Sequence, residues 1–387
     1  MAGFTELTRR LMADRGVSVR GLAKIVAYDQ GGLSRIIDGK RPCPPYLARA
    51  IDDALDAGGQ VRTAATAAPG PLPDTEKVRR SLEDALASGQ MSPAMLADWE
   101  ESADRYGYRT RDTPSPVLLA DLIADIADLR LAAERHRSAS ALPRLALVAA
   151  RMSGMVVLVL IRAGDRQAFR RWARTARHAA AEAGDGPALS WAVAQEAYGY
   201  YYAGDMPGAV ACARTALDAA PHPCVGGALA AALEMRAHAA MGDAASARRA
   251  LEVADRIHGQ LTGEALAASA FGYAESQLRF HAGDALTRLG DTGPARQELR
   301  RALELCPPDD YTDRSLAMLD MAACMIADGD PEAGMEHAAR ALASLDAQRR
   351  QGIIDERARE LLAALPPAAS ALPAARDVRD LLEATAL

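Results

Sequence analysis

The side chains best suited to recognition chemistry lie near the start of the chain. A short helix is expected here, and on it Ser34 and Arg35 follow Gln30 by about one helical turn. A glutamine amide can bond bidentately to N6 and N7 of adenine, and hydroxyl and guanidinium groups can reach bases or phosphates. Residues 1–41 carry eight Lys or Arg against four Asp or Glu, although the whole chain has a net charge of −6. A basic end on an acidic protein is typical of a phosphate-facing module.

Nowhere in the sequence do residues have the spacing of a catalytic or metal site. The seven histidines are scattered, and the chain has no phosphate-cradling glycine loop, nucleophile elbow or metalloprotease signature. The five cysteines are widely spread without a C-x-x-C pair, which indicates free thiols in a reducing compartment. We therefore expect no enzymatic activity, no cofactor and no bound metal.

The sequence also predicts a protein of the cytoplasm. The longest uninterrupted apolar stretch, residues 155–161, is far shorter than the roughly 20 residues of a membrane span. The first six residues lack a basic region followed by an apolar core, so we expect no signal peptide.

Short amphipathic helices are predicted around the recognition side chains. Ser18 is a suitable N-cap for the second helix, and Gly39 is a suitable terminator for the third. The apolar spacing places these helices at residues 4–14, 19–26, 30–38 and 46–57.

Two strings in this region resemble the phage-repressor-type helix-turn-helix family: Val19-Arg20-Gly21-Leu22-Ala23, and Leu33-Ser34-Arg35-Ile36-Ile37-Asp38-Gly39-Lys40-Arg41. The resemblance covers about residues 4–57 and implies double-stranded DNA as a partner, with the third helix in the major groove. Gln30 then stands at a base-reading position, whereas Arg20, Lys40 and Arg41 would contact the phosphate backbone. The chain departs from the family pattern at Gly31-Gly32, which lowers helix propensity and removes two side chains that could read bases.

Beyond this domain the composition changes. Residues 61–73 are rich in Ala, Thr, Pro and Gly, which predicts a flexible tether. Helices are expected at 76–87, 93–106 and 117–137. The last of these has an apolar seam, Leu119, Leu122, Ile126 and Leu129, for which packing within the chain is a commoner explanation than dimerisation.

From about residue 150 a Gly-Asp pair recurs at intervals of 40, 38, 48 and 39 residues. The pairs begin at Gly164, Gly204, Gly242, Gly290 and Gly329, and twelve residues after each glycine stands an alanine. The glycine would let the chain reverse, and the aspartate would cap the next helix. The 48-residue interval suggests one unusually long helix between Gly263 and Leu289.

These repeats resemble tetratricopeptide repeats, although the family's usual interval is shorter. The resemblance implies a solenoid of helix pairs whose first helices line a concave surface that binds a peptide, a small molecule or a protein. Tyrosines and arginines on that face suit such binding, although packing between repeats is an equally ordinary role for them. The projection puts eight residues on the inner face: Trp191, Tyr198, Tyr201, Tyr202, Arg236, Gln277, Phe280 and Arg288.

The sequence thus predicts an all-α chain, a helix-turn-helix bundle followed by a tetratricopeptide-like α-solenoid. The expected parts are the DNA-binding domain 1–60, a linker 61–75, a helical connector 76–148, and repeats with C-terminal helices 149–387. Together the two resemblances imply a bacterial, homodimeric transcriptional regulator whose repeats sense a ligand or partner and control dimer geometry. The alternative is a protein-interaction scaffold that works through its solenoid, with the first domain vestigial or protein-binding.

Overall fold

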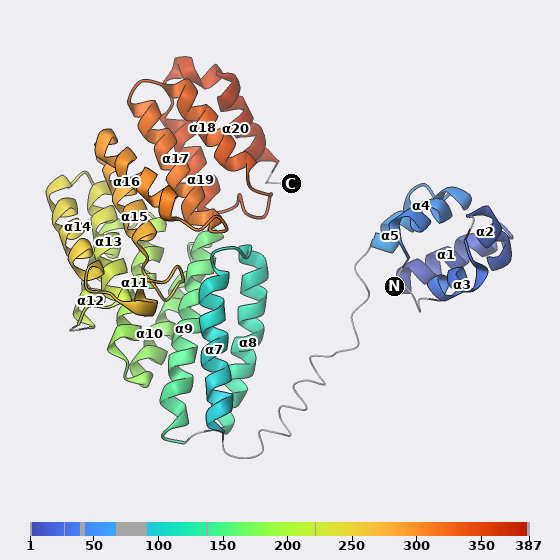
Figure 1. Ribbon diagram of the computed structural model, residues 1–387, viewed down its shortest axis with the longest axis horizontal. Helices are drawn as coiled ribbons and strands as arrows, with labels where there is room; N and C mark the ends of the chain where they lie inside the picture. The colour runs from blue at the N-terminus through green and yellow to red at the C-terminus, as the bar shows by residue number, and fades with distance from the viewer. Residues whose placement is uncertain are drawn as a thin grey trace. The chain divides into compact units, whose positions relative to one another are not determined.

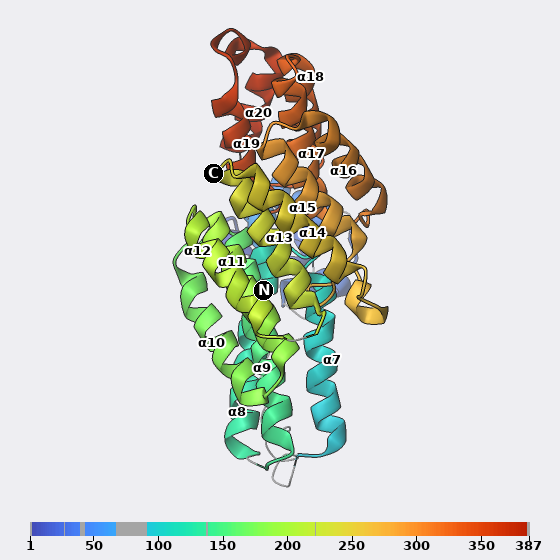
Figure 2. The ribbon, with the colours of Figure 1, turned by 90° about the vertical axis from the view of Figure 1, so that its left-hand side faces the viewer.

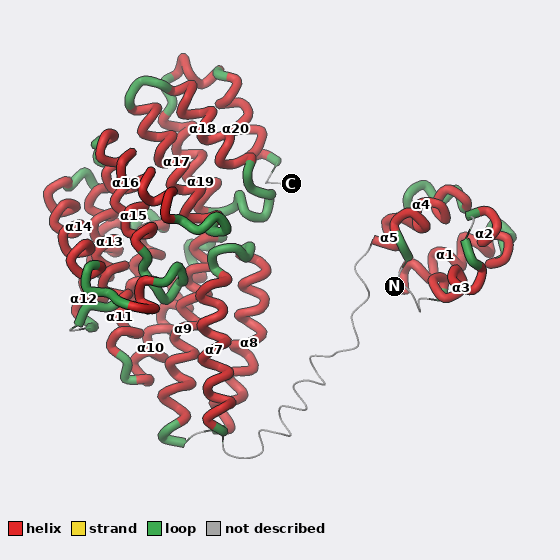
Figure 3. The backbone as a smooth tube through the Cα atoms, viewed as in Figure 1, coloured by secondary structure: helices red, strands yellow, loops and turns green. Residues whose placement is uncertain are grey.

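The computed structural model describes residues 2–26, 28–38, 43–66, 91–136, 138–220 and 222–384. Within these ranges all regular structure is helical and no strand is present (Figures 1 and 3). The chain divides into two compact units, residues 1–89 and 90–387, which we call the amino-terminal and the carboxy-terminal unit. The predicted all-α class is confirmed.

The amino-terminal unit is a small bundle around one apolar core. Its helices are α1 (Ala2–Asp14), α2 (Val19–Ile25), α3 (Gln30–Ile37), α4 (Pro45–Ala54) and α5 (Gln60–Thr66). The side chains of Ser18 and Asp29 cap α2 and α3 by accepting from the backbone N–H groups of Gly21 and Gly32. The core contains Phe4, Met12, Leu22, Leu33, Ile36, Ile37, Leu47, Ile51, Leu55 and Val61.

Helix α5 corrects the predicted start of the linker. Val61 is completely buried, so the chain still belongs to the bundle at the point where we expected a tether. The buried carboxylate of Asp52 on α4 accepts from the backbone N–H groups of Gly59 and Val61, each at 2.7 Å. An Ala- and Thr-rich composition did not reveal this anchor, because the anchor depends on a side chain from the preceding helix. Residues 67–75 of the expected linker and the expected helix 76–87 lie outside the described residues.

The carboxy-terminal unit is built from antiparallel helix pairs that stack in chain order (Figures 1 and 2). The five pairs are α9 with α10, α11 with α12, α13 with α14, α15 with α16, and α17 with α18. Contacts between α9, α11, α13, α15 and α17 join successive pairs, as in a solenoid. The bounds are α7 (Pro93–Arg109), α8 (Ser115–Arg135), α9 (Ala141–Arg162), α10 (Ala168–Ala183), α11 (Gly186–Tyr202), α12 (Met206–Asp218), α13 (Val225–Ala240), α14 (Ala244–His258), η1 (Gly263–Leu266), α15 (Glu275–Arg288), α16 (Thr292–Leu305), α17 (Tyr311–Ala327), α18 (Pro331–Ala343), α19 (Ile353–Ala364), η2 (Pro367–Ala371) and α20 (Pro373–Glu383).

The five glycines turn the chain as predicted, but not every aspartate caps the next helix, since the side chain of Asp291 makes no cap hydrogen bond to α16. All five glycines have a left-handed φ between 76° and 91°, which a residue with a Cβ rarely adopts. Asp205, Asp243 and Asp330 each cap the helix that follows by accepting from a backbone N–H three residues on. The alanines at the twelve-residue spacing are 0–2% exposed, at crossings too close for a larger side chain. They are Ala176, Ala216, Ala254, Ala302 and Ala341.

One further pair, Gly184-Asp185, was missed because it falls within a repeat interval. Gly184 has a φ of 68°, and Asp185 caps α11 through the N–H of Ala188. By contrast, Gly283 lies inside α15, where a Cβ would come within 2.6 Å of Leu299. The same dipeptide therefore marks a turn in one context and a close helix crossing in another.

The prediction of a long helix between Gly263 and Leu289 is wrong. The extra residues form η1 and a non-helical segment, residues 267–274, which we call the strap. The strap is tied to other helices by backbone groups: Ala270 N–H donates to Gly107 O at 3.0 Å, and Trp191 Nε1 donates to Ala270 O at 2.8 Å. Helical spacing of apolar residues is a local signal, and these distant partners outweigh it.

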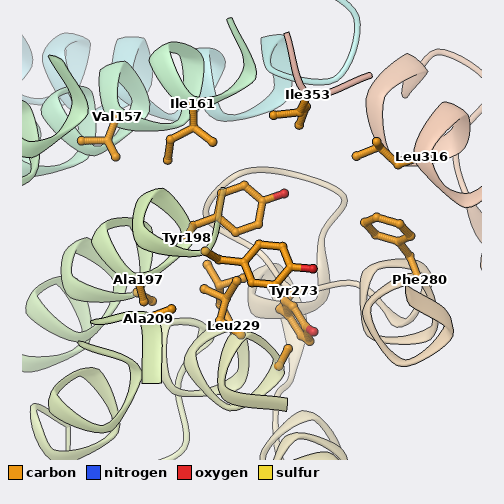
Figure 4. Close-up of a cluster of buried hydrophobic side chains, with 14 of the residues drawn as sticks. Val157, Ile161, Ala197, Tyr198, Ala209, Leu229, Tyr273, Phe280, Leu316 and Ile353 are labelled. Atoms are coloured by element: carbon orange, nitrogen blue, oxygen red, sulfur yellow. The ribbon is translucent and has the colours of Figure 1, made fainter. Parts of the chain in front are cut away.

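Helix α9 is the apolar centre of the carboxy-terminal unit. Among the described residues it is the one helix long and apolar enough to cross a membrane, with a mean hydropathy of 2.0, but 67% of that window is buried inside the protein. It packs against α7, α8, α10 and α11. Figure 4 shows Val157 and Ile161 of α9 facing side chains of α11 and α13. Burial in the core accounts for its composition.

The apolar seam of α8 is used inside the unit. Leu122 and Leu129 are 0% and 3% exposed, and Leu119 and Ile126 pack half-buried against the same core. Packing within the chain, the commoner of the two explanations, therefore accounts for this seam.

Candidate functional site

Helix α3 has one buried and one exposed face. Leu33 and Ile36 are completely buried, whereas Gln30 and Arg35 are exposed and Ser34 is half-buried. The structure therefore brings the three predicted base-reading side chains onto one accessible surface of one helix. Arg20 is exposed on the neighbouring helix α2. Lys40 and Arg41 lie outside the described residues.

The glycines at the start of α3 have different surroundings. A Cβ on Gly32 would lie 3.0 Å from the ring of Tyr28 and 3.1 Å from Oδ2 of Asp29, so a side chain there would press on the cap. Gly31 is exposed and its carbonyl accepts from Arg35 Nε at 3.2 Å. The departure from the family pattern thus has a packing reason at Gly32, and it leaves the backbone bare at Gly31.

An ion pair that the sequence did not suggest joins α1 to the end of α3. Arg9 Nη2 lies 2.5 Å from Oδ1 of Asp38, and both side chains are accessible. An exposed pair of this kind contributes little to stability, about 0–1 kcal/mol. Its effect is to hold one basic side chain beside the exposed face of α3.

In the carboxy-terminal unit, six of the eight predicted inner-face residues form one cluster with Asp284, and three of the six contact its carboxylate. Arg236 Nε and Tyr201 Oη contact its Oδ2 at 2.8 and 3.1 Å, and Arg288 Nε donates to Oδ1 at 3.1 Å. Arg236 and Asp284 are 2% and 2% exposed, so this is a fully buried ion pair. The cluster comprises Tyr198, Tyr201, Tyr202, Arg236, Phe280, Asp284 and Arg288.

The aromatic rings of this cluster surround the Arg236 guanidinium. Its Cζ lies 4.3 Å from the ring centroid of Tyr201 and 5.5 Å from those of Tyr202 and Phe280. Such cation–π contacts strengthen when they are shielded from water. Burial by itself raises the pKa of Asp284, but Arg236 and Arg288 outweigh it and hold that pKa well below its usual range. The Asp284 carboxylate is therefore ionised, and both of its oxygens accept hydrogen bonds, although Arg236 Nη1 is buried without a partner.

The other two predicted inner-face residues lie apart from this cluster. Trp191 packs against Phe271 of the strap, with ring centroids 5.0 Å apart. Gln277 lines a different cavity, described next. The expected open concave surface is wrong for most of these residues, because Trp191, Tyr198, Tyr201, Arg236 and Phe280 are all at most 7% exposed. The strap packs on Trp191, and residues of α19 line a pocket together with the cluster around Asp284; neither contact was predicted.

A cavity of about 60 Å³ lies near the middle of the carboxy-terminal unit, with strap residues in its wall. Arg111 pairs with Asp310 and, at 3.1 Å, with Asp313, and it also donates to Ser269 O of the strap. Arg162 donates to Thr110 O and to Thr312 Oγ1. The wall is formed by Thr110, Arg111, Leu158, Arg162, Gln195, Tyr198, Leu229, Ala270, Gly272, Tyr273, Gln277, His281, Asp310, Thr312 and Asp313.

Two titratable groups of this wall are displaced toward their neutral forms. Burial raises the pKa of Asp313 to about 6, and the nearby Asp310 adds to the effect. Burial lowers the pKa of His281 well below its usual range, so its imidazole is neutral and shares a 2.8 Å hydrogen bond with Tyr273 Oη. Sequence spacing could not find this cavity, because its walls come from five helices and the strap.

The described residues hold no group of three or more His, Cys, Asp or Glu side chains arranged for a metal ion. The buried carboxylates are instead opposed by arginines, as in the pair of Asp320 with Arg357 at 2.7 Å.

No family model matches this chain, and no curated protein or solved structure is significantly similar to it.

Proposed function

We propose that the protein is a cytoplasmic, homodimeric transcriptional regulator of the helix-turn-helix class. In this proposal α3 of the amino-terminal unit reads double-stranded DNA, and the carboxy-terminal unit binds a signal molecule or a partner protein. Two copies would present two α3 helices to two half-sites, and a ligand that prefers one arrangement of the dimer would change their spacing.

The observation that carries the proposal is the division of α3 into two faces. Leu33 and Ile36 anchor the helix in the core, while Gln30, Ser34 and Arg35 stand on the accessible side. A helix held in this way can enter the major groove with its polar side chains at base edges. The exposed Gly31 adds no side chain, which allows the backbone to approach the DNA closely but leaves few residues to read it.

The carboxy-terminal unit supports sensing more than it supports a scaffold. A scaffold that grips its partner in the concave groove needs accessible aromatic side chains on that face. Tyr201 and Phe280 are 3% and 1% exposed, and they already pack around the Arg236 guanidinium. A small molecule in an internal cavity fits these surroundings better than a long partner segment.

The test is binding to DNA by the full-length chain. Genome-wide footprinting of the tagged protein would supply target fragments, and a mobility-shift assay would measure affinity for them at physiological salt. We expect Arg35→Ala to weaken binding at least about fivefold, because one good base contact contributes about 1–3 kcal/mol. The matched control is Arg49→Ala, an exposed arginine on α4, which should bind within threefold of the original chain.

Affinity should also fall steeply as salt rises, because phosphate contacts release counterions. No enrichment of specific fragments, together with equal behaviour of Arg35→Ala and Arg49→Ala, would overturn the proposal in favour of the scaffold.

A further inference from the structure

The central cavity of the carboxy-terminal unit has polar atoms in its wall that no other group satisfies. Gln195, on α11, is 3% exposed, and its Oε1 has no hydrogen-bond partner. Oε1 of Gln277, on α15, is likewise unpartnered, and both residues line the cavity. An unpartnered buried amide oxygen is costly, so such an atom in a native protein calls for a bound water, ion or other molecule.

The same wall also has hydrogen-bond donors to spare. The Nε atoms of Arg111 and Arg162 are buried without partners, although the terminal nitrogens of both guanidinium groups are bonded. The residues around the cavity therefore offer two amide oxygens as acceptors and two arginine N–H groups as donors. A molecule that complements them carries both N–H groups and a carbonyl oxygen.

The charges of the wall cancel. Two arginines, Arg111 and Arg162, face two aspartates, Asp310 and Asp313, and the imidazole of His281 is neutral. Burial raises the pKa of Tyr198 and of Tyr273, so these two phenols are neutral as well. An ion would gain little from such a balance and would lose its hydration, so a neutral polar molecule is favoured.

The size of the cavity limits the occupant further. A buried water needs roughly 10–15 Å³ of such space, and the cavity measures about 60 Å³. It therefore takes a group of about four to six non-hydrogen atoms by the same scale. That excludes a folded peptide and leaves a small molecule or the head group of a slightly larger one.

We infer that the central cavity is a binding site for a small neutral carboxamide or urea, whose N–H groups donate to Gln195 and Gln277 and whose carbonyl accepts from an arginine of the wall. This site names the ligand class for the sensing role, and in that respect it rests on the proposed function. Ala270, Gly272 and Tyr273 of the strap belong to the same wall, so occupancy also protects the strap from hydrogen exchange.

The test uses acetamide as the probe and the full-length chain as the receptor, with saturation-transfer NMR at millimolar probe concentrations. N,N-dimethylacetamide, which has no N–H group, and acetate, which is charged, are the control probes. We expect acetamide to bind and both controls to bind at least tenfold more weakly.

Gln195→Met and Gln277→Met keep the approximate volume of the side chain and remove its amide. Each should weaken acetamide binding at least tenfold, whereas Gln297→Met, on the exposed surface of α16, should leave it unchanged. Circular dichroism checks the fold of each variant. If Gln195→Met fails to fold, Gln277→Met carries the test from the opposite wall.

Three results would overturn the inference: no acetamide binding, which would mean ordered water only; equal binding of dimethylacetamide; or binding that survives both glutamine variants. The DNA mobility shift is measured on the same preparations. Loss of the ligand site with DNA binding intact removes only this inference, whereas ligand binding by a chain that does not bind DNA removes only the regulator.

Discussion

The two units place their polar side chains in opposite ways. In the amino-terminal unit the side chains that the sequence singled out, Gln30 and Arg35, are exposed over a mainly apolar core. In the carboxy-terminal unit the singled-out residues Arg236 and Tyr201 are themselves part of the interior, where they satisfy Asp284. An arginine is therefore accessible to a binding partner in one unit, whereas in the other unit an arginine is buried and bonded within the fold.

The spacing of residues in the sequence therefore identifies polar side chains, but it does not show whether their hydrogen bonds are already made within the fold. An exposed arginine keeps its hydration and can exchange water for a phosphate or base. A buried arginine has lost that hydration and depends on its carboxylate partner. Substitutions should therefore affect binding in the amino-terminal unit and stability in the carboxy-terminal unit.

The largest effect is expected for Arg236→Met. It leaves the carboxylate of Asp284 buried with one arginine fewer, and breaking a buried pair costs about 3–5 kcal/mol of unfolding free energy. Urea unfolding followed by tryptophan fluorescence measures this directly, because Trp99, Trp172 and Trp191 all lie in the carboxy-terminal unit.

Arg214→Met is the matched control for Arg236→Met. Arg214 is 61% exposed and pairs with Glu234 at 2.8 Å, so its loss should cost about 0–1 kcal/mol. Equal losses of unfolding free energy for the two substitutions would show that buried and exposed arginines do not differ in their contribution to stability.

Leu33→Ala tests whether the amino-terminal unit is stabilised by its own apolar core, independently of the carboxy-terminal unit. Leu33 is completely buried, and its truncation should cost about 2–5 kcal/mol, enough to unfold a small bundle. DNA binding should be lost while the tryptophan-monitored transition of the other unit stays unchanged. Ile25→Ala, at a side chain that is 60% exposed, should leave both unaltered. A shift of the tryptophan transition by Leu33→Ala would show that the units do not unfold independently.

Gly226→Ala probes the close helix packing of the carboxy-terminal unit. The added Cβ would lie 2.3 Å from the backbone nitrogen of Trp191, and a backbone atom cannot move aside as a side chain can. We expect a loss of about 1–3 kcal/mol in the fluorescence-monitored unfolding. At Gly293, which has no atom within 4 Å, the same substitution should stabilise α16 by up to about 1 kcal/mol. A loss at both positions would point to backbone strain rather than to packing.

The smallest effect concerns the anchor of α5 in the amino-terminal unit. Burial works to raise the pKa of Asp52, but hydrogen bonds from the backbone N–H groups of Gly59, Val61 and Arg62 outweigh it, so the pKa is lowered. Because the pKa is lower in the folded chain, the stabilisation is present above the ordinary aspartate value of about 3.9. It is lost as the pH falls through the lower folded value.

Amide NMR signals of Gly59 and Val61 should follow this acid titration. Asp52→Asn should weaken the anchor at neutral pH by on the order of 1 kcal/mol and abolish its acid dependence. Asp53→Asn, at the exposed neighbour, should do neither. An unchanged titration in Asp52→Asn would assign the acid response to another carboxylate.

Much of the fold was predictable because its signals are local. Gly204 and Asp205 together specify a turn and a cap within a few residues, and Ala216 marks the crossing that follows. The strap was not predictable in the same way. Its course depends on hydrogen bonds to Trp191 and Gly107, which lie far away in the sequence. The spacing of apolar residues between Gly263 and Leu289 cannot indicate these partners.

The two candidate sites differ in the same way, since one follows from local sequence signals and the other depends on distant segments. The exposed face of α3 followed from helical spacing, since Leu33 and Ile36 point inward and therefore Gln30 and Arg35 point outward. Nothing in the local sequence distinguishes Asp284, the carboxylate of the buried cluster, because it follows a glycine just as the aspartates of the turns do. Its role depends on Arg236 from another helix pair.

By itself, the sequence determined that this chain is all-helical, that its first helices form a separate basic module, and that its later helices pair at Gly-Asp turns. Backbone dihedrals, caps and apolar spacing act within a few residues, so they can be read along the chain. Tertiary contacts determined that the strap bonds to Trp191, and that Arg236, Arg288 and Tyr201 contact Asp284. They also determined that Gln195 and Gln277 line one cavity. Those outcomes depend on which buried polar groups find partners, and that is settled by side chains brought together from distant helices.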